Sequence, residues 1–408
     1  MKRIGWYIVL LVAALVLTGV GVNAAVRQSD QRDGENCASC HPGPARDYAR
    51  GKMSDTVGCL ACHGSPHSSD PSESMPTAAT CGACHPDQAK EFNSGKHALA
   101  WEALQVVPNY SAAPPSARAT GCDGCHGIGQ TWADGSAGRC NSCHGRHTFS
   151  VAEAREPEAC AHCHIGDHPQ YDIWSTSRHG QIYSLTRDDS RAPKCQTCHM
   201  PEGKHNSMTS WGFLGLRGEE PDQQWAKLRE PISMMLKDLG PANAPNVMRP
   251  TMQQWQGLRD EMTQICASCH SHTFAQRRLE LGDDMLRDTD KLFGTVVQAA
   301  YGLEKVGVLD PLKRQSLTRS ALAHRFSAFM GAFHFGYEYA WDDGYLALMD
   351  DMINIKALAG PAAGAITLPA GITPPAGMTP PAGMTPPAGM TPPAGMTLPA
   401  AGDGGGRE

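Results

Sequence analysis

The chain has 408 residues, a formal net charge of −6 at pH 7, 16 cysteines, 18 histidines and only 6% aromatic residues. The acidic balance argues against nucleic acid as a partner and favours a partner with a basic face. So few aromatic side chains also argue against a conventional large apolar core.

Residues 1–25 have the composition of an export signal. The basic pair Lys2-Arg3 precedes an apolar run from Ile8 to Val22, and the segment ends in residues that suit signal peptidase. The alternative is an uncleaved N-terminal membrane anchor, because the apolar run is nearly long enough to span a bilayer. Both interpretations predict a periplasmic or otherwise exported protein.

Eight Cys-x-x-Cys-His runs, numbered 1 to 8 in chain order, lie between residues 37 and 270 and use all 16 cysteines. Run by run, the cysteines are Cys37 and Cys40, Cys59 and Cys62, Cys81 and Cys84, Cys122 and Cys125, Cys140 and Cys143, Cys160 and Cys163, Cys195 and Cys198, and Cys266 and Cys269. The histidines that follow them are His41, His63, His85, His126, His144, His164, His199 and His270.

Each run is the attachment signal for a covalently bound c-type haem. The two thiols add across the haem vinyl groups, and the adjoining histidine becomes the proximal iron ligand. A zinc site would combine ligands four at a time and would not need a histidine after every second cysteine. The sequence therefore predicts eight c-type haems and leaves no thiol for a disulfide.

Residues 26–275 form the predicted octahaem domain, with roughly 30 residues per haem in the stretch that holds the runs. That is too little polypeptide to enclose each porphyrin, so the porphyrins are expected to form the core, with their edges close enough for electron transfer. Short helices are expected to carry the runs, and longer ones are expected over residues 223–240, with a break at Pro231, and over residues 251–276. The predicted fold class is mainly α: a multihaem cytochrome c with little regular structure around packed haems, followed by a C-terminal helical bundle.

The C-terminal helical region is predicted for residues 276–357. Apolar residues recur at helical spacing over 285–303 and 322–333, with a stop between them at Asp310-Pro311. Stripes of this kind suit a bundle core or a subunit interface. Residues 358–408 repeat a Pro-Ala-Gly-Met-Thr theme that opposes helix and strand, so a disordered tail is expected, and its methionines suit a spacer better than a copper site.

The other ten histidines are candidates for the distal iron positions. An electron-transferring haem usually has two strong axial ligands, whereas a catalytic haem keeps one face open. Seven bis-histidine haems and one open haem would need seven of the ten. Five candidates lie in the haem-dense part: His67, His97, His147, His179 and His205. Three more, His272, His324 and His334, compete for the other two positions, and we favour His272 and His334.

His168 is set apart from these ligands because Asp167 precedes it directly. A neighbouring carboxylate can adjust an imidazole toward proton transfer near neutral pH. The alternative is that His168 is an eighth distal ligand. His162, inside run 6, is expected to be a surface residue.

Several short motifs together resemble the octahaem hydroxylamine oxidoreductase family over about residues 37–345. They are FNSGKHAL (92–99), GCDGCHG (121–127), HTF (147–149), DHPQ (167–170), SRHG (177–180), CQTCHMPEG (195–203) and WGF (211–213). The resemblance implies that the haem of run 4 is five-coordinate and catalytic. It also implies that Asp167 and His168 lie over its open face as a proton-handling pair.

In family members that oxidise hydroxylamine, a tyrosine from the C-terminal part of a neighbouring subunit bonds covalently to the catalytic haem, which implies a homotrimer. Members without this bond tend to run reductively. Tyr339 best matches the crosslinking segment, and Tyr337, Tyr345 and Trp341 are the alternatives.

Three functions follow from these patterns. The first is oxidation of hydroxylamine or hydrazine at the run 4 haem, with electrons leaving through seven bis-histidine haems to a soluble or membrane-anchored cytochrome c or a quinone-linked partner. The second is reduction of nitrite to hydroxylamine or ammonium at the same haem. The third is electron transfer without catalysis, in which all eight irons are six-coordinate.

The histidine count generates a first test. We expect one of the eight irons to bind cyanide or nitric oxide in the resting protein, because one distal position is predicted to be open. Optical and electron paramagnetic resonance (EPR) titration with either ligand measures this. Eight low-spin irons that are all inert to both ligands would exclude the two enzymatic functions.

Overall fold

The computed structural model describes residues 37–64, 74–105, 108–166, 168–230, 232 and 249–360. The predicted export signal, the repeat tail, His67 and Asp167 lie outside the described residues. Within these ranges, no helix has both the length and the apolar character that a membrane span requires.

Short helices carry the haem-binding runs in whole or in part, and the described ranges contain no strand beyond one isolated bridge between Thr131 and Ala137. Several helices begin at a proline, whose fixed φ suits the first helical position and which needs no N–H partner there. The elements are α2 Cys37–Cys40, α3 Pro42–Tyr48, η1 Lys52–Asp55, α4 Leu60–His63, α5 Ala78–Gly82, α6 Pro86–Asn93, η3 Lys96–Leu99, α7 Ala100–Gln105, α8 Pro108–Ala112, α9 Pro115–Thr120, α10 Cys122–His126, η4 Gly127–Gly129, η5 Cys140–Ser142, α11 Val151–Ala154, α12 Pro157–Ala161, α13 Gln170–Thr176, α14 Arg178–Thr186, α15 Cys195–His199, η6 Pro201–Gly203 and η7 Phe213–Gly215.

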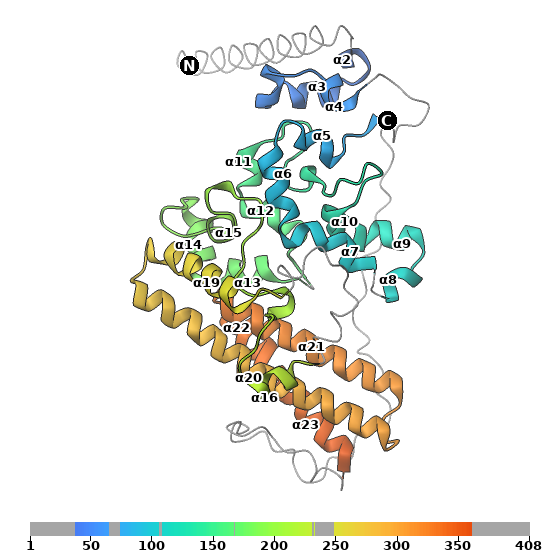
Figure 1. Cartoon of the computed structure of the whole chain (residues 1–408), viewed down its shortest axis with the longest axis vertical. Helices are drawn as coiled ribbons and strands as arrows, with labels where there is room; N and C mark the ends of the chain where they lie inside the picture. The colour runs from blue at the N-terminus through green and yellow to red at the C-terminus, as the bar shows by residue number, and fades with distance from the viewer. Residues whose placement is uncertain are drawn as a thin grey trace, which may run out of the picture. The chain divides into compact units, whose positions relative to one another are not determined.

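Four longer helices, α19, α20, α21 and α23, and three short ones follow the haem-dense part within the described residues, and the predicted mainly α fold class is confirmed (Figure 1). They are α16 Gln223–Leu228, α19 Met252–Ala267, α20 His272–Lys305, α21 Pro311–His334, α22 Tyr337–Ala340, the π-helical turn η8 Trp341–Leu346 and α23 Ala347–Ala359. The domain boundary expected at residue 275 falls inside α20, so the last haem-binding run leads directly into the bundle.

A short helix carries both cysteines of the run only in runs 1, 4 and 7, and in the other five runs one cysteine lies outside the helix. In runs 3, 5, 6 and 8 the helix ends before the second cysteine, so these cysteines lie just outside it: Cys84, Cys143, Cys163 and Cys269. In run 2, Cys62 lies inside α4, and the first cysteine, Cys59, is the residue before the helix. The runs therefore share a common local turn and not a common helix.

The prediction of one continuous helix over residues 251–276 is wrong. α19 ends at Ala267, inside run 8, and α20 begins after Ser271, whose hydroxyl accepts a hydrogen bond from the Phe274 N–H. The stop expected at Asp310-Pro311 is confirmed. Asp310 caps α21 by accepting from the Lys313 N–H, and the proline takes the first helical position.

The bundle core lies where α20 packs against α21 and α23. The predicted stripe on α20 is buried over residues 292–303, whereas on α21 only Phe329 of the predicted stripe is fully buried. The reason is that α21 also faces the haem-dense part, through its contact with α13. The helices α20 and α21 therefore form a bundle and also contribute to the haem-binding body.

A buried carboxylate joins three elements inside the bundle, and the apolar pattern gave no sign of it. Asp290 accepts hydrogen bonds from Trp225 Nε1 at 2.7 Å and Arg325 Nε at 2.5 Å, and Arg229 Nε lies 2.9 Å from it. All four side chains are nearly inaccessible to water. A buried Asp290 carboxylate without its partners would cost much free energy, so this contact fixes α16, α20 and α21 relative to one another.

A second polar contact ties α21 to α23. His324 Nδ1 lies 2.8 Å from an Asp351 carboxylate oxygen, and this hydrogen bond is the main cause that raises the pKa of His324. A histidine whose pKa is raised by folding contributes stability that is complete below its unfolded pKa of about 6.5 and is lost as pH rises through the folded value.

His324→Gln tests this contribution. We expect the variant to lower the melting temperature at pH about 5.5 and to differ less from the unaltered protein at pH about 9, where His324 is neutral in both states. Thermal unfolding of the holoprotein across this range measures the difference. A deficit that is the same at every pH would mean that the charge of His324 plays no part.

Candidate functional site: the imidazole pairs

Six histidines of the haem-binding runs each face a second imidazole, with ring centroids 6.0–6.3 Å apart. The histidines of runs 1 and 3, His41 and His85, are not among these six pairs. Within the described residues, the pairs are His63–His147 in run 2, His126–His168 in run 4, His144–His205 in run 5, His164–His97 in run 6, His199–His334 in run 7 and His270–His179 in run 8.

This spacing fits an iron between two imidazoles. An iron–nitrogen bond of about 2 Å, with roughly 1 Å from the nitrogen to the ring centre, places the two ring centres about 6 Å apart. The sixteen cysteines all lie within the described ranges, and none of them forms a disulfide. The donor set and the spacing therefore both fit c-type haem at these six positions.

A tight turn sets the two thiols of a run beside each other. In runs 2, 3 and 8 the N–H of the second cysteine, which is Cys62, Cys84 or Cys269, donates to the carbonyl of the first at 3.2 Å. Runs 5 and 6 have the same hydrogen bond, at 3.3 and 3.1 Å. In a turn of this 3₁₀ type, side chains three residues apart lie on the same side of the backbone. Both thiols can therefore reach one porphyrin edge.

The exposure of the cysteines agrees with attachment to a large group. Five of the sixteen are exposed and the other eleven are partly buried, so none has a place of its own in the protein core. The exposed cysteines are Cys40, Cys84, Cys122, Cys140 and Cys269. Cysteine is otherwise among the most buried residue types, so this distribution suits thiols that serve as attachment points.

Hydrogen bonds orient several of the proximal rings. The Nδ1–H groups of His63, His126 and His199 donate to the backbone carbonyls of Ser74, Ala100 and Met208 at 2.8–2.9 Å. A proton fixed on Nδ1 leaves Nε2 with its lone pair available for iron. The haem-facing nitrogen is therefore set before any haem binds.

Neighbouring sulfurs show which runs lie side by side. Cys81 of run 3 interacts with Cys140 of run 5, and Cys160 of run 6 interacts with Cys195 of run 7. Cys125 of run 4 interacts in the same way with Cys163 of run 6. Run 4 therefore lies beside run 6, which in turn lies beside run 7.

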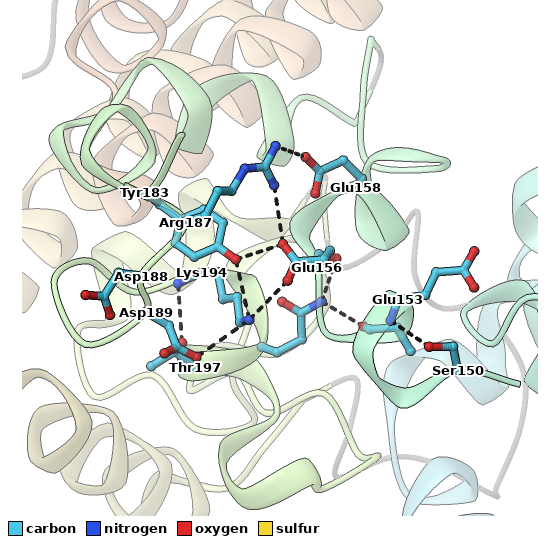
Figure 2. A network of polar contacts seen from close by, with 12 residues as sticks. Ser150, Glu153, Glu156, Glu158, Tyr183, Arg187, Asp188, Asp189, Lys194 and Thr197 are labelled. Atoms are coloured by element: carbon cyan, nitrogen blue, oxygen red, sulfur yellow. Dashed lines mark hydrogen bonds and ion pairs between the residues drawn. The ribbon is translucent and has the colours of Figure 1, made fainter. Parts of the chain in front are cut away.

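A polar network fixes runs 6 and 7 against each other (Figure 2). The buried Tyr183 on α14 donates a 2.8 Å hydrogen bond to Glu156, which also lies near Lys194 and Arg187. From run 7, the Gln196 amide donates to the Ala154 and Glu156 carbonyls, each at 3.0 Å. Because these residues flank the two haem-binding runs, the network holds the runs at one separation.

Five of the distal candidates each lie opposite a proximal histidine: His97, His147, His179 and His205 from the haem-dense part, and His334. His67 lies outside the described residues, and the remaining favoured candidate, His272, is exposed at the first residue of α20 and is not in any of the six pairs. Its competitor His324 is engaged with Asp351. His162 is exposed.

His168 lies at the same distance from its proximal partner as the distal histidines do. Its ring centroid is 6.1 Å from that of His126, and its other face meets Phe326 of α21 edge-on at 6.2 Å. Among the six distal histidines in these pairs, His168 alone is exposed, on a turn next to Gly166, whose φ is +62°. The run 4 pair therefore has the same ring spacing as the other five pairs but differs from them in the exposure of its distal histidine.

The aromatic residues of the segment expected to form a crosslink differ in their exposure and in their neighbours. Tyr339 is half-buried, and burial together with the nearby Asp172 charge raises its pKa. Asp172 accepts a hydrogen bond from Gly166 in the His168 turn, so Tyr339 belongs to the surroundings of the run 4 site in its own chain. Tyr337 is 75% exposed, and Trp341 stacks on Tyr345 with ring centroids 5.4 Å apart.

Lys96 is a residue that sequence reasoning missed. Its Nζ donates to Thr209 Oγ1 at 2.7 Å and to the Trp211 carbonyl at 2.8 Å, and burial lowers its pKa to about 8. The only signal in the sequence was its position directly before His97. Phe326 was assigned to an apolar stripe, and its contact with His168 could not be read from helical spacing.

Comparisons with known proteins identify the family of the haem-binding runs. The family described as "Seven times multi-haem cytochrome CxxCH" matches residues 55–309, which contain seven of the eight runs. A Kuenenia stuttgartiensis protein named as a probable nitrite reductase-hydroxylamine oxidoreductase fusion is 31% identical over 260 residues. That alignment covers 57% of this chain but only 29% of the relative.

Two solved structures share the fold. A hypothetical multiheme protein is 20% identical with a TM-score of 0.66, covering 84% of this chain and 98% of that one. A chain of the Kuenenia stuttgartiensis reducing HAO-like protein complex is 22% identical with a TM-score of 0.64, covering 84% of this chain and 87% of that one. At these identities the likeness concerns the fold.

Two histidines on one helix provide a matched test of the pairs. We expect His334→Ala to convert one low-spin haem to a high-spin haem that binds added imidazole, because it removes the partner of His199. His324→Gln, ten residues earlier on α21, should leave the spin state of every haem as it is in the unaltered protein. EPR spectra of both variants measure this, and identical spectra would remove His334 from the ligand set.

Proposed function

Because this chain belongs to the multihaem cytochrome family with repeated Cys-x-x-Cys-His runs, we propose that it is an exported octahaem oxidoreductase that oxidises hydroxylamine or hydrazine at run 4. The observation that supports run 4 is the exposed His168 facing His126, beside run 6. The other paired distal histidines are enclosed to a greater degree and suit permanent ligation.

When bound, a c-type haem supplies an iron that exchanges electrons and polarises a nitrogen donor. His126 holds the proximal side, with its Nδ1 proton donated to the Ala100 carbonyl. His168 stands on the distal side, where an imidazole can accept the protons that hydroxylamine loses as it is oxidised. Proton removal keeps charge from accumulating in a site of low dielectric constant.

At 6.1 Å from His126, the His168 ring leaves no room for a substrate between itself and an iron. The spacing therefore favours the alternative in which His168 is a distal ligand and run 4 is not five-coordinate at rest, so that a substrate would have to displace His168. The exposed turn that carries His168 is suited to this movement. A molecule with only two heavy atoms, such as hydroxylamine or hydrazine, needs the smallest displacement. Asp167 precedes His168 in the sequence and is proposed as its proton-handling partner.

Nitrite reduction at the same site is the second candidate. It is favoured by the half-buried position of Tyr339 beside Asp172 of its own chain, because an intersubunit crosslink needs a tyrosine that can reach a neighbouring subunit. If Tyr339 does form that bond, the protein is a homotrimer and the oxidative direction is favoured. Electron partners would be a cytochrome c or a quinone-linked carrier with a basic docking face.

His168→Ala is the central variant. We expect hydroxylamine oxidation with an artificial acceptor to fall by roughly 100-fold, because removal of a positioned proton acceptor has about that effect. Cyanide should bind to the variant faster than to the unaltered protein, since no imidazole has to leave first.

His162→Ala is the matched control, because His162 is also exposed and the sequence predicts it to be a surface residue. It should change neither turnover nor cyanide binding. Nitrite reduction measured on the same preparations decides the direction. Full hydroxylamine turnover in His168→Ala would refute run 4 as the site.

A further inference from the structure

A second candidate site, separate from run 4, is the ammonium group of Lys96. Its hydrogen-bond acceptors, Thr209 Oγ1 and the Trp211 carbonyl, are both neutral, and Thr209 itself donates to the same carbonyl at 2.9 Å. Within the part of the chain that the structure describes, no carboxylate is paired with it, and burial is the one cause that shifts its pKa. A charge in this position is therefore solvated by dipoles and not neutralised.

Residues 207–209 connect Lys96 to two imidazole pairs. Thr209 accepts from Lys96, Ser207 Oγ lies 3.2 Å from His97 Nδ1 of the run 6 pair, and the Met208 carbonyl accepts from His199 Nδ1 of the run 7 pair at 2.8 Å. Burial is the main cause that lowers the pKa of His97 to about 4, and the charges of His164, His199 and Lys96 are smaller causes. Burial also lowers the pKa of His199 in the run 7 pair, with His164 and Lys96 as further causes. The ammonium group is thus near the ligands of both positions.

The segment that carries Lys96 has no freedom to move away. A Cβ on Gly95 would lie 2.4 Å from the Asn206 carbonyl oxygen, and a Cβ on Gly129 would lie 2.6 Å from the His97 carbonyl oxygen. The Lys96-His97 segment is therefore closely packed against the backbone at Asn206 and at Gly129. The charge is fixed with respect to the two imidazole pairs by close packing.

We propose that Lys96 is an uncompensated positive charge that raises the reduction potentials of the run 6 and run 7 haems. A fixed positive charge disfavours the more positive ferric state at both positions. Since run 6 lies beside run 4, the effect makes the two haems better acceptors for electrons that leave run 4. The proposal rests on haem binding at these runs and does not depend on the substrate.

The size of the effect follows from Coulomb's law. A unit charge about 10 Å from an iron, at an effective dielectric constant of about 20, changes the reduced-to-oxidised ratio on the order of tenfold. This is large enough to separate two haems from the other six in a redox titration.

Lys96→Gln tests the proposal, because glutamine can still donate to Thr209 and Trp211 but carries no charge. Redox titration of the eight-haem protein, followed by optical and EPR spectra, should show two haems whose reduced fraction at a fixed potential falls about tenfold. Lys96→Arg keeps the charge and should leave the titration unchanged. Lys90→Met, at an exposed lysine on α6 close in sequence, should also have no effect.

Two results would overturn the proposal. One is a Lys96→Gln protein in which all reduction potentials are unchanged. The other is a Lys96→Arg protein whose reduction potentials shift as much as those of Lys96→Gln, because the effect would then come from the shape of the side chain and not from its charge. If Lys96→Gln fails to assemble with eight haems, Lys96→Met is titrated in its place. If only Lys96→Arg assembles, the charge binds an anion such as a haem propionate and is not uncompensated, which also refutes the claim.

Discussion

The separation of about 6 Å between facing imidazoles is the constraint on which the rest of this structure depends. Six proximal histidines meet it, each with a distal partner from a different part of the chain. Such pairs fix the relative positions of segments that share little apolar surface. Polar contacts such as the Tyr183–Glu156 network and the Lys96 hydrogen bonds then hold neighbouring runs in register.

Helix α21 connects the bundle to this arrangement. Arg325 faces inward to the buried Asp290, Phe326 touches the ring of His168, and His334 completes the run 7 pair at the C-terminal end of the helix. One helix therefore anchors itself in the bundle core, lines the candidate catalytic position and supplies a proposed iron ligand. A shift of α21 would change both haem positions at once, which accounts for the buried ion pair that fixes it.

Local sequence was sufficient to predict the fold class and the Cys-x-x-Cys-His runs that define the multihaem cytochrome family, because each run needs only adjacent residues. It was insufficient for the distal partners, since His147 and His63, or His334 and His199, meet only after folding. His324 and His334 are both on α21, and only the fold decides that one faces Asp351 and the other faces His199. The charge of Asp290 within an apolar stripe was likewise invisible, because its partners come from α16 and α21.

The central claim is that His168 occupies the distal position of run 4 and leaves it for a small nitrogenous ligand. The most direct test is a pair of crystal structures of the haem-loaded protein, without ligand and soaked with hydroxylamine or nitric oxide. The account predicts His168 Nε2 at bonding distance from the run 4 iron in the first, and the ligand there with His168 turned away in the second. His168 bound in both structures, with the ligand at another iron, would contradict it.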